Sequence, residues 1–142
     1  MKRIIFFAPI IFIVLISCSK KEVKFESFSP EAFAYDLGNV WEVNATVNVR
    51  GFDQHENQNE ESFSVSISYS VDITTPEGKK IENLYSDNID LSKHDKFTDI
   101  PVEAQFDLDS TYTPGKYELI FNIKDNYSNE EINGKVLFDL SK

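Results

Sequence analysis

Carboxylates are the most numerous groups in this chain that could do chemistry. The 142 residues include 24 Asp and Glu against 14 Lys and Arg. Three polar stretches each contain two or more acidic residues: Asp87-Asn88-Ile89-Asp90, Asp107-Leu108-Asp109 and the segment 53–61. Such oxygen ligands suit Ca²⁺, although none of the three matches an EF-hand loop. A solvated acidic rim is the simpler interpretation, so no metal ligand is assigned, and a calcium-dependent site in these loops stays an alternative.

Other catalytic groups form no recognisable constellation in the sequence. His55 and His94 have no HExxH or paired spacing that would indicate a zinc site. The many serines lack the GxSxG and SxxK motifs of nucleophilic hydrolases, and the five glycines form no phosphate-binding loop. We therefore predict no cofactor and no enzyme, with a small enzyme or enzyme subunit built on the acidic loops as the alternative.

The acidic balance narrows the class of partner. The formal net charge is −10, and such a surface repels nucleic acids and anionic lipid headgroups. Nucleic acid is therefore not expected among the partners.

The single cysteine, Cys18, ends an apolar leader. Lys2 and Arg3 give a basic start, and residues 4–16 then carry no charge, although Pro9 interrupts them. A helix of that length measures about 20 Å, short of the roughly 30 Å hydrocarbon core of a bilayer. This pattern is typical of a signal peptide and not of a membrane span.

Leu15-Ile16-Ser17-Cys18 resembles the bacterial lipobox. In lipoproteins the cysteine sulfur receives a diacylglyceryl group, and cleavage leaves the acylated cysteine as the mature N-terminus. The resemblance implies that Cys18 is lipidated, with acyl chains such as palmitate holding the protein to a membrane. An ordinary signal peptide, or a buried strand with a free thiol, stays open as the alternative.

Residues next to the leader and in one loop resemble other envelope signals. Ser19 follows the cysteine, where Asp often retains lipoproteins in the inner membrane, so the outer membrane is favoured. The stretch from Ser19 to Glu22 partly resembles export tags of Bacteroidota surface lipoproteins, which leaves the periplasmic or surface face undecided. Asp109-Ser110-Thr111 resembles a Bacteroidota O-glycosylation site, which makes Ser110 a candidate for modification.

The rest of the chain alternates apolar and polar residues with period 2, the pattern of strands with one buried face. The alternation is strongest over residues 41–49, 63–73 and 117–123. A shorter strand is expected from Lys80 to Tyr85. Further strands are expected from Phe97 to Leu108, where Pro101 marks an edge or bulge, and over residues 136–140. Ser29-Pro30-Glu31 predicts a single helical turn, and residues 53–61 a long loop. About seven strands fit an all-β antiparallel sandwich.

Residues 114–138 resemble the end of many bacterial Ig-like domains, with Pro114-Gly115-Lys116-Tyr117, then Ile123-Lys124-Asp125, then Phe138. The resemblance implies an Ig-like sandwich in which Tyr117 forms the tyrosine corner. The cysteine expected two residues later is replaced by Leu119, which excludes an antibody-type disulfide. Trp41 lies on the apolar parity of the best strand, so we expect it in the core.

These observations divide the chain into a signal peptide (1–17), a lipidated Cys18 with its tether (18–28) and an Ig-like sandwich (29–142). The expected role is that of a lipid-anchored, non-enzymatic binding or assembly module of the cell envelope. Loops or a sheet edge would contact an envelope protein or a glycan, an expectation that rests on analogy with Ig-like folds.

Overall fold

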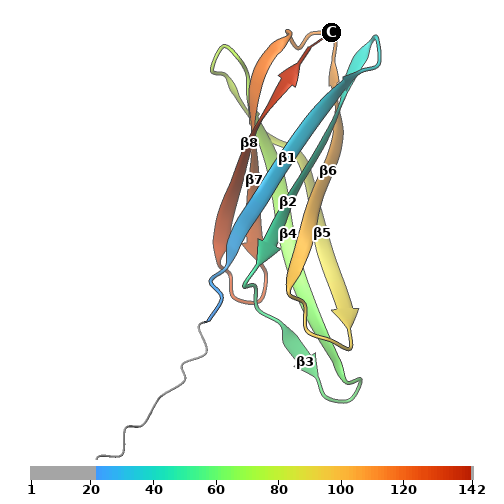
Figure 1. Cartoon of the computed structure of the whole chain (residues 1–142), viewed down its shortest axis with the longest axis vertical. Helices are drawn as coiled ribbons and strands as arrows, with labels where there is room; N and C mark the ends of the chain where they lie inside the picture. The colour runs from blue at the N-terminus through green and yellow to red at the C-terminus, as the bar shows by residue number, and fades with distance from the viewer. Residues whose placement is uncertain (1–21, 142) are drawn as a thin grey trace, which may run out of the picture.

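The computed structural model describes residues 22–141, so the predicted leader and Cys18 lie outside the described part. The described residues form eight strands and no helix (Figure 1). The strands are β1 (Glu26–Asp36), β2 (Val40–Arg50), β3 (His55–Asn57), β4 (Ser62–Thr74), β5 (Lys80–Lys93), β6 (Asp99–Asp109), β7 (Gly115–Asp125) and β8 (Glu131–Leu140). Within residues 22–141, no helix is long and apolar enough to cross a membrane.

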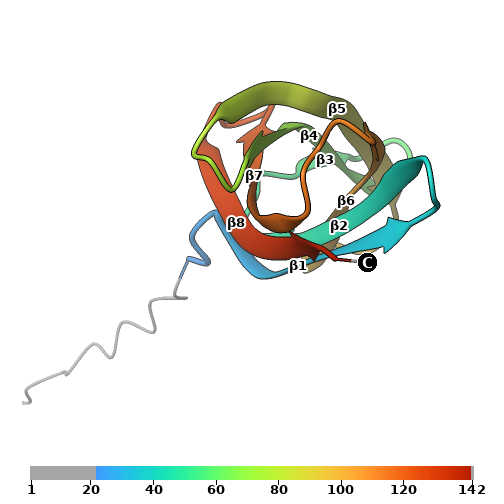
Figure 2. The same cartoon turned by 90° about the horizontal axis from the view of Figure 1, so that it is seen from above.

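Two antiparallel sheets face each other, which confirms the predicted all-β sandwich (Figure 2). One sheet has the order β1-β2-β6. The other has β4 paired with β5 on one side and β7 on the other, with β8 beyond β7. Short β3 pairs with the first residues of β4, below the end of β7. The sandwich thus has three strands in one sheet and five in the other, counting short β3, and the chain crosses between the sheets several times.

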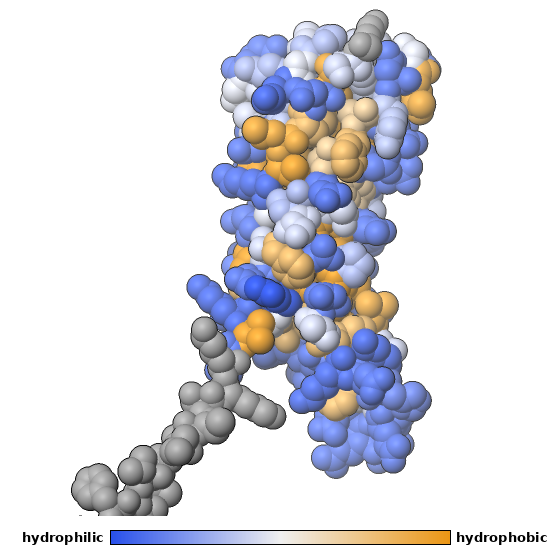
Figure 3. All heavy atoms as spheres, in the orientation of Figure 1, coloured by the Kyte–Doolittle hydropathy of each residue, from blue (hydrophilic) through white to orange (hydrophobic). Residues whose placement is uncertain are grey.

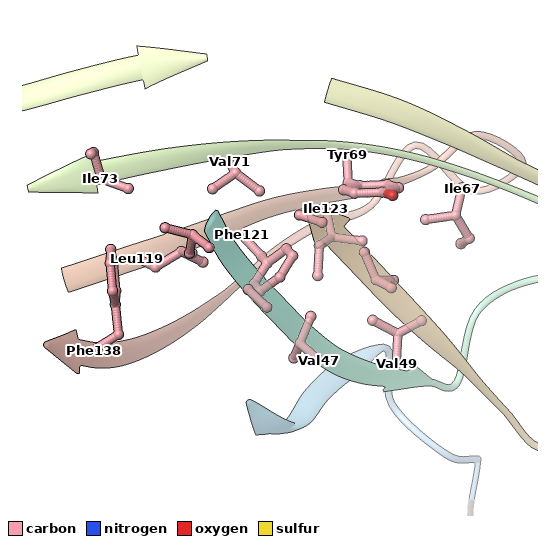
Figure 4. Close-up of a cluster of buried hydrophobic side chains, with 14 of the residues drawn as sticks. Val47, Val49, Ile67, Tyr69, Val71, Ile73, Leu119, Phe121, Ile123 and Phe138 are labelled. Carbon is pink, nitrogen blue, oxygen red and sulfur yellow. The ribbon is translucent and has the colours of Figure 1, made fainter. Parts of the chain in front are cut away.

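The core lies between the sheets and is built from the alternating positions that the sequence predicts. The odd positions of β2 from Trp41 to Val49 are all buried, as are alternate residues of β4 and β7. Figure 4 shows side chains of β2, β4 and β7 meeting in this layer. The labelled residues are Val47, Val49, Ile67, Tyr69, Val71, Ile73, Leu119, Phe121, Ile123 and Phe138.

The predicted helical turn at Ser29-Pro30-Glu31 is wrong, because β1 runs through it. The register against β2 shifts between Phe28 and Glu31, and Ser29 has a positive φ of 50°. This bulge accommodates Pro30, which has no N–H for the ladder and is tolerated at the edge of a sheet. The sandwich also begins before the predicted boundary at residue 29, since Phe25 is buried in the core.

Two other segments differ from the prediction. The strand expected from Lys80 to Tyr85 continues to Lys93, so the stretch Asp87 to Asp90 is strand and not loop. The predicted loop 53–61 contains β3, which accounts for an eighth strand. The expectation for Pro101 is confirmed, because β6 is an edge strand.

Candidate functional site

The two sheets differ in width, and this leaves an open groove along one flank. On the other flank β1 lies against β8, where the Ser27 hydroxyl donates to the Asn133 carbonyl at 2.8 Å. On the open flank β5 and β6 are both edge strands, and they do not pair with each other. The groove has a volume of about 600 Å³ and is lined by residues of β1, β2, β4, β5 and β6.

The floor of the groove is the inward side of β5, which the narrower sheet does not cover. Ile89 and Leu91 pair with Ile67 and Val65 of β4, so they share the core-facing side of the sheet. Ile89 is half-buried, but Leu91 is 44% exposed. The groove therefore offers apolar surface that belongs to the core side of the sandwich.

A tyrosine pair closes the inner end of the groove. The Tyr69 hydroxyl donates to the backbone carbonyl of Glu103 in β6, which links the two sheets. Burial raises the pKa of Tyr69 far above its ordinary value, so the hydroxyl stays a donor. The Tyr85 ring packs between Tyr69 and Phe106, with centroid distances of 6.2 Å and 6.5 Å. The three rings therefore fill this end of the groove.

The charged residues lining the groove are all acidic. They are Glu31 of β1, Asp87 of β5 and Glu103 of β6. Uncharged hydrogen-bonding groups come from Asn44, Thr46 and Gln105 on the outer face of the three-stranded sheet. The lining therefore accepts cations and hydrogen-bond donors, and its field disfavours anions.

Exposed aromatic surface extends the groove onto the outer face of β1. Phe33 is 57% exposed and lies in one row with Asn44 of β2 and Gln105 of β6. In β1 the small residues Ala32 and Ala34 point inward while the aromatic residues between and after them point outward. In Figure 3 this side of the molecule carries separate apolar patches among hydrophilic atoms, while the end near β3 is almost wholly hydrophilic.

The carboxylates considered as calcium ligands do not converge. Asp109 pairs with Val40 at the start of β2, whereas Asp53 follows Arg50 at the end of β2, so the two lie at opposite ends of the sandwich. Asp87 and Asp90 lie within β5, and no group of three or more His, Cys, Asp or Glu in residues 22–141 could hold a metal. In the described residues the three acidic stretches therefore do not meet at one end of the sandwich.

The two histidines make local contacts near the start of β4. The His55 ring stacks on Tyr127 with centroids 3.6 Å apart. The His94 Nδ1 lies 2.9 Å from the Glu61 carbonyl oxygen. These contacts tie loops to the sheet and give the histidines a packing role.

Ser110 lies in the turn between β6 and β7 and is exposed. The neighbouring Asp109 carboxylate accepts hydrogen bonds from the Thr111 hydroxyl and from the Thr111 N–H, the latter at 2.8 Å. These bonds hold the pKa of Asp109 below its ordinary value. The turn presents Ser110 to solvent, as access by a modifying enzyme would require.

Tyr117 makes the contact expected of a tyrosine corner. Its ring is buried, and its hydroxyl donates to the Thr113 carbonyl four residues upstream at 2.8 Å. Burial raises the pKa of Tyr117, which keeps the hydroxyl a donor near neutral pH.

Replacing Tyr117 by Phe keeps the ring and removes this one hydrogen bond. We expect Tyr117→Phe to lower the free energy of unfolding by about 0.5–1.5 kcal/mol, measured by urea denaturation. Tyr112→Phe is the matched control, because the Tyr112 ring packs 6.5 Å from Tyr117 and its hydroxyl makes none of the described hydrogen bonds. If Tyr117→Phe and Tyr112→Phe have equal free energies of unfolding, the Tyr117 hydrogen bond does not stabilise the fold.

Asp72 is a buried carboxylate that period-2 reasoning placed on the solvent face of β4. Its oxygens accept hydrogen bonds from the Asn83 N–H at 2.8 Å and the Asn122 amide at 3.0 Å, and Lys80 Nζ lies 3.1 Å away. Burial raises the pKa of Asp72, but these three partners lower it more, so the pKa lies below the ordinary 3.8.

This lowered pKa gives a pH-dependent contribution to stability. The charged form is favoured by folding, so its contribution is complete above the unfolded pKa and is lost as the pH falls through the folded pKa. We expect Asp72→Asn to destabilise the protein near pH 7 and the difference from the parent protein to shrink toward about pH 3. Urea denaturation across this range measures it, and a difference that stays constant with pH would contradict the assignment.

Comparison with known proteins identifies no family for this chain. No family model matches the sequence, and no curated protein matches it. Among solved structures, it is similar to the X-ray structure of Northeast Structural Genomics Consortium target SoR45. The two are 12% identical, with a TM-score of 0.45, over 86% of this chain and 89% of that chain. A likeness of this size carries no functional conclusion.

Proposed function

We propose that this protein is a lipid-anchored binding module of the bacterial cell envelope that acts without catalysis. The observation that carries the binding role is the groove between β5 and β6, where core-side apolar surface meets an acidic rim. An exposed apolar surface costs solubility unless a partner covers it. Its lining offers contacts through aromatic, aliphatic, amide and carboxylate groups, which suit recognition of a protein or a glycan.

The anchor in this proposal is supported by the leader sequence. A basic start, a short apolar stretch and Leu15-Ile16-Ser17-Cys18 occur in the order that lipoprotein export requires. The first strand begins at Glu26. Eight residues from Cys18 extend over at most about 30 Å, so the sandwich would stay close to the bilayer. The outer membrane is the favoured location, through Ser19.

The anchor predicts the behaviour of Cys18→Ala. This change removes the sulfur that would receive the diacylglyceryl group, so labelling with radioactive palmitate should be lost and the protein should leave the detergent phase on phase separation. Ser17→Ala is the matched control, because it keeps a small residue before the cysteine and should still be labelled. A parent protein whose mature N-terminus is unmodified by mass spectrometry would overturn the anchor.

Co-purification from native membranes tests the binding role. Protein carrying the chain's own leader is cross-linked in whole cells, extracted with detergent and compared with the variant Leu91→Asp, which places a charge in the groove. We expect a partner that the parent protein retains and the variant loses. Partners that both forms retain equally would place recognition outside the groove.

A further inference from the structure

We propose that the groove binds an extended, basic segment of a partner protein, which adds as a strand to the free edge of β5. The inference rests on the binding role proposed above and names the chemistry of the partner. Strand addition provides affinity through backbone hydrogen bonds and specificity through pockets for alternate side chains.

The pairing pattern leaves backbone groups of β5 without a strand partner. From Phe63 to Val71 the strand β4 pairs with β5 in register. Among the described residues β5 pairs with no other strand, so its second edge is free. An edge strand of this kind presents unpaired N–H and C=O groups that a further strand can use. Lysines, which block such an edge in many proteins, lie only at the two ends of β5, and its middle carries Asp87 and Asp90.

The opposite edge, on β6, is less suited to pairing at the same level. Pro101 has no N–H to donate, and the Glu103 carbonyl already accepts a hydrogen bond from Tyr69. Both features lie in the part of β6 that lines the groove. A strand entering the groove therefore pairs with β5 and uses β6 as a side-chain wall.

A strand in this position would complete the cover of the core. Its inward side chains would lie beside Ile89 and Leu91 and opposite Ile100, all of which line the groove. Burying the exposed part of Leu91 removes apolar surface from water, which favours binding. The inward positions of the added strand should therefore be apolar and of medium size.

Charge decides which segment fits. Glu31, Asp87 and Glu103 line the groove, and none of the residues that line it is basic. Asp90 lies on the outward row of β5 and Asp87 on its inward row, whereas Glu31 and Glu103 face outward from the other sheet. Lys or Arg on the outward side of the added strand would lie beside Asp90, and a basic residue on the inward side would meet Asp87, while an acidic strand would be repelled. A second copy of this chain fits poorly for the same reason, since its net charge is −10.

Fluorescence anisotropy with a defined probe tests this proposal on detergent-solubilised full-length protein. The probe is a fluorescein-labelled decapeptide of alternating Lys and Val. We expect saturable binding that weakens as salt is raised. Two control peptides isolate the two claims: Glu replaces every Lys in one, and N-methyl groups on alternate backbone amides prevent strand pairing in the other. Both should bind at least tenfold more weakly.

Substitutions place the binding in the groove. Asp87→Asn with Asp90→Asn keeps shape and removes two charges from β5, and we expect about a five- to tenfold loss of affinity. Leu91→Ser should cost a similar factor, because it removes apolar contact. The matched control is Glu118→Gln with Asp139→Asn, which removes two charges from β7 and β8 and should change affinity less than twofold. Circular dichroism confirms that each variant is folded.

Several results would overturn the proposal. One is an absence of saturable binding, and another is that either control peptide binds as well as the probe. A third is an equal loss of affinity in the groove variants and in the β7–β8 variant. The last is that a neutral oligosaccharide, and not the peptide, binds saturably and that Leu91→Ser abolishes this binding. These failures are distinct from failure of the proposed function. A partner lost with Leu91→Asp in cells, together with no peptide binding, would keep the groove and reject the basic strand.

Discussion

Trp41→Ala is expected to lower the free energy of unfolding by about 3–5 kcal/mol, the range for removing a large aromatic side chain from a packed core. Trp41 is 4% exposed and opens the core-facing row of β2. It pairs with Asp36 of β1 and with Leu108 of β6, and Leu108 is itself buried. Neighbours held in two ladders cannot collapse into the space left by the indole, so the cavity remains and its cost is added to the lost burial.

Tyr35→Ala is the matched control for this prediction. Tyr35 is an aromatic residue of the same sheet, but it is 56% exposed, so its loss should change stability by less than about 0.5 kcal/mol. Urea denaturation followed by far-UV circular dichroism compares the variants, because Trp41 is the single tryptophan and its fluorescence is lost with it. In the parent protein the same fluorescence should be blue-shifted when folded. An emission typical of an exposed indole, or a cost below about 1 kcal/mol, would contradict the packing described here.

Local alternation was sufficient to predict the strands whose two faces differ in burial. β2, β4 and β7 are interior strands of their sheets, and each buries one face against the opposite sheet. Their apolar positions therefore recur every second residue without interruption. The partner strands and their order could not be read from this pattern, since alternation gives the buried face of a strand and not its neighbour.

β5 shows why the rest could not be predicted. Its inward row is Tyr85, Asp87, Ile89, Leu91 and Lys93, which alternates poorly because the lower half overhangs the narrower sheet. The sequence therefore ended this strand at Tyr85 and placed acidic Asp87 and Asp90 in a loop. The groove follows from the difference in width between two sheets, which no single segment encodes. The mixed row on β5 was the one sequence signal that could have indicated it.

Buried carboxylates were also missed, for a related reason. Asp72 and Asp125 occupy positions that local patterning assigns to a polar face and to a turn. Their burial depends on donors supplied by distant segments, such as Asn122 for Asp72 and the Asp53 N–H for Asp125. The alternation within one strand does not predict partners that are distant in the sequence. An Asp followed by Asn and Ser in a turn is nevertheless typical of hydrogen bonds from backbone N–H groups to the Asp side chain.

Asp125→Ala is expected to cost about 2–3 kcal/mol, because Asp125 joins two connections at one end of the sandwich. Its carboxylate is buried, with the residue 1% exposed. It accepts hydrogen bonds from the Asp53 N–H at 2.7 Å, the Tyr127 N–H at 2.9 Å and the Ser128 hydroxyl at 2.9 Å. Asp53 belongs to the crossing from β2 to the other sheet, and the other two belong to the β7–β8 hairpin. Removing the carboxylate leaves these donors without their acceptor in a partly buried place.

Two further variants separate this role from a general effect of losing charge. Asp125→Asn keeps an acceptor oxygen for some of these donors and should cost about half as much, whereas Asp139→Ala removes an exposed acid of β8 and should be nearly neutral. Urea denaturation measures the costs, and hydrogen exchange should show faster exchange of the Asp53 and Tyr127 amides in Asp125→Ala.

The binding proposal makes one further prediction for this variant. The groove lies on the β5–β6 flank, and Asp125 is not among the residues that line it, so Asp125→Ala should leave affinity for the Lys-Val peptide unchanged at temperatures where it is folded. A loss of peptide affinity in the folded variant would mean that the β7–β8 end takes part in recognition and that the groove as described is incomplete.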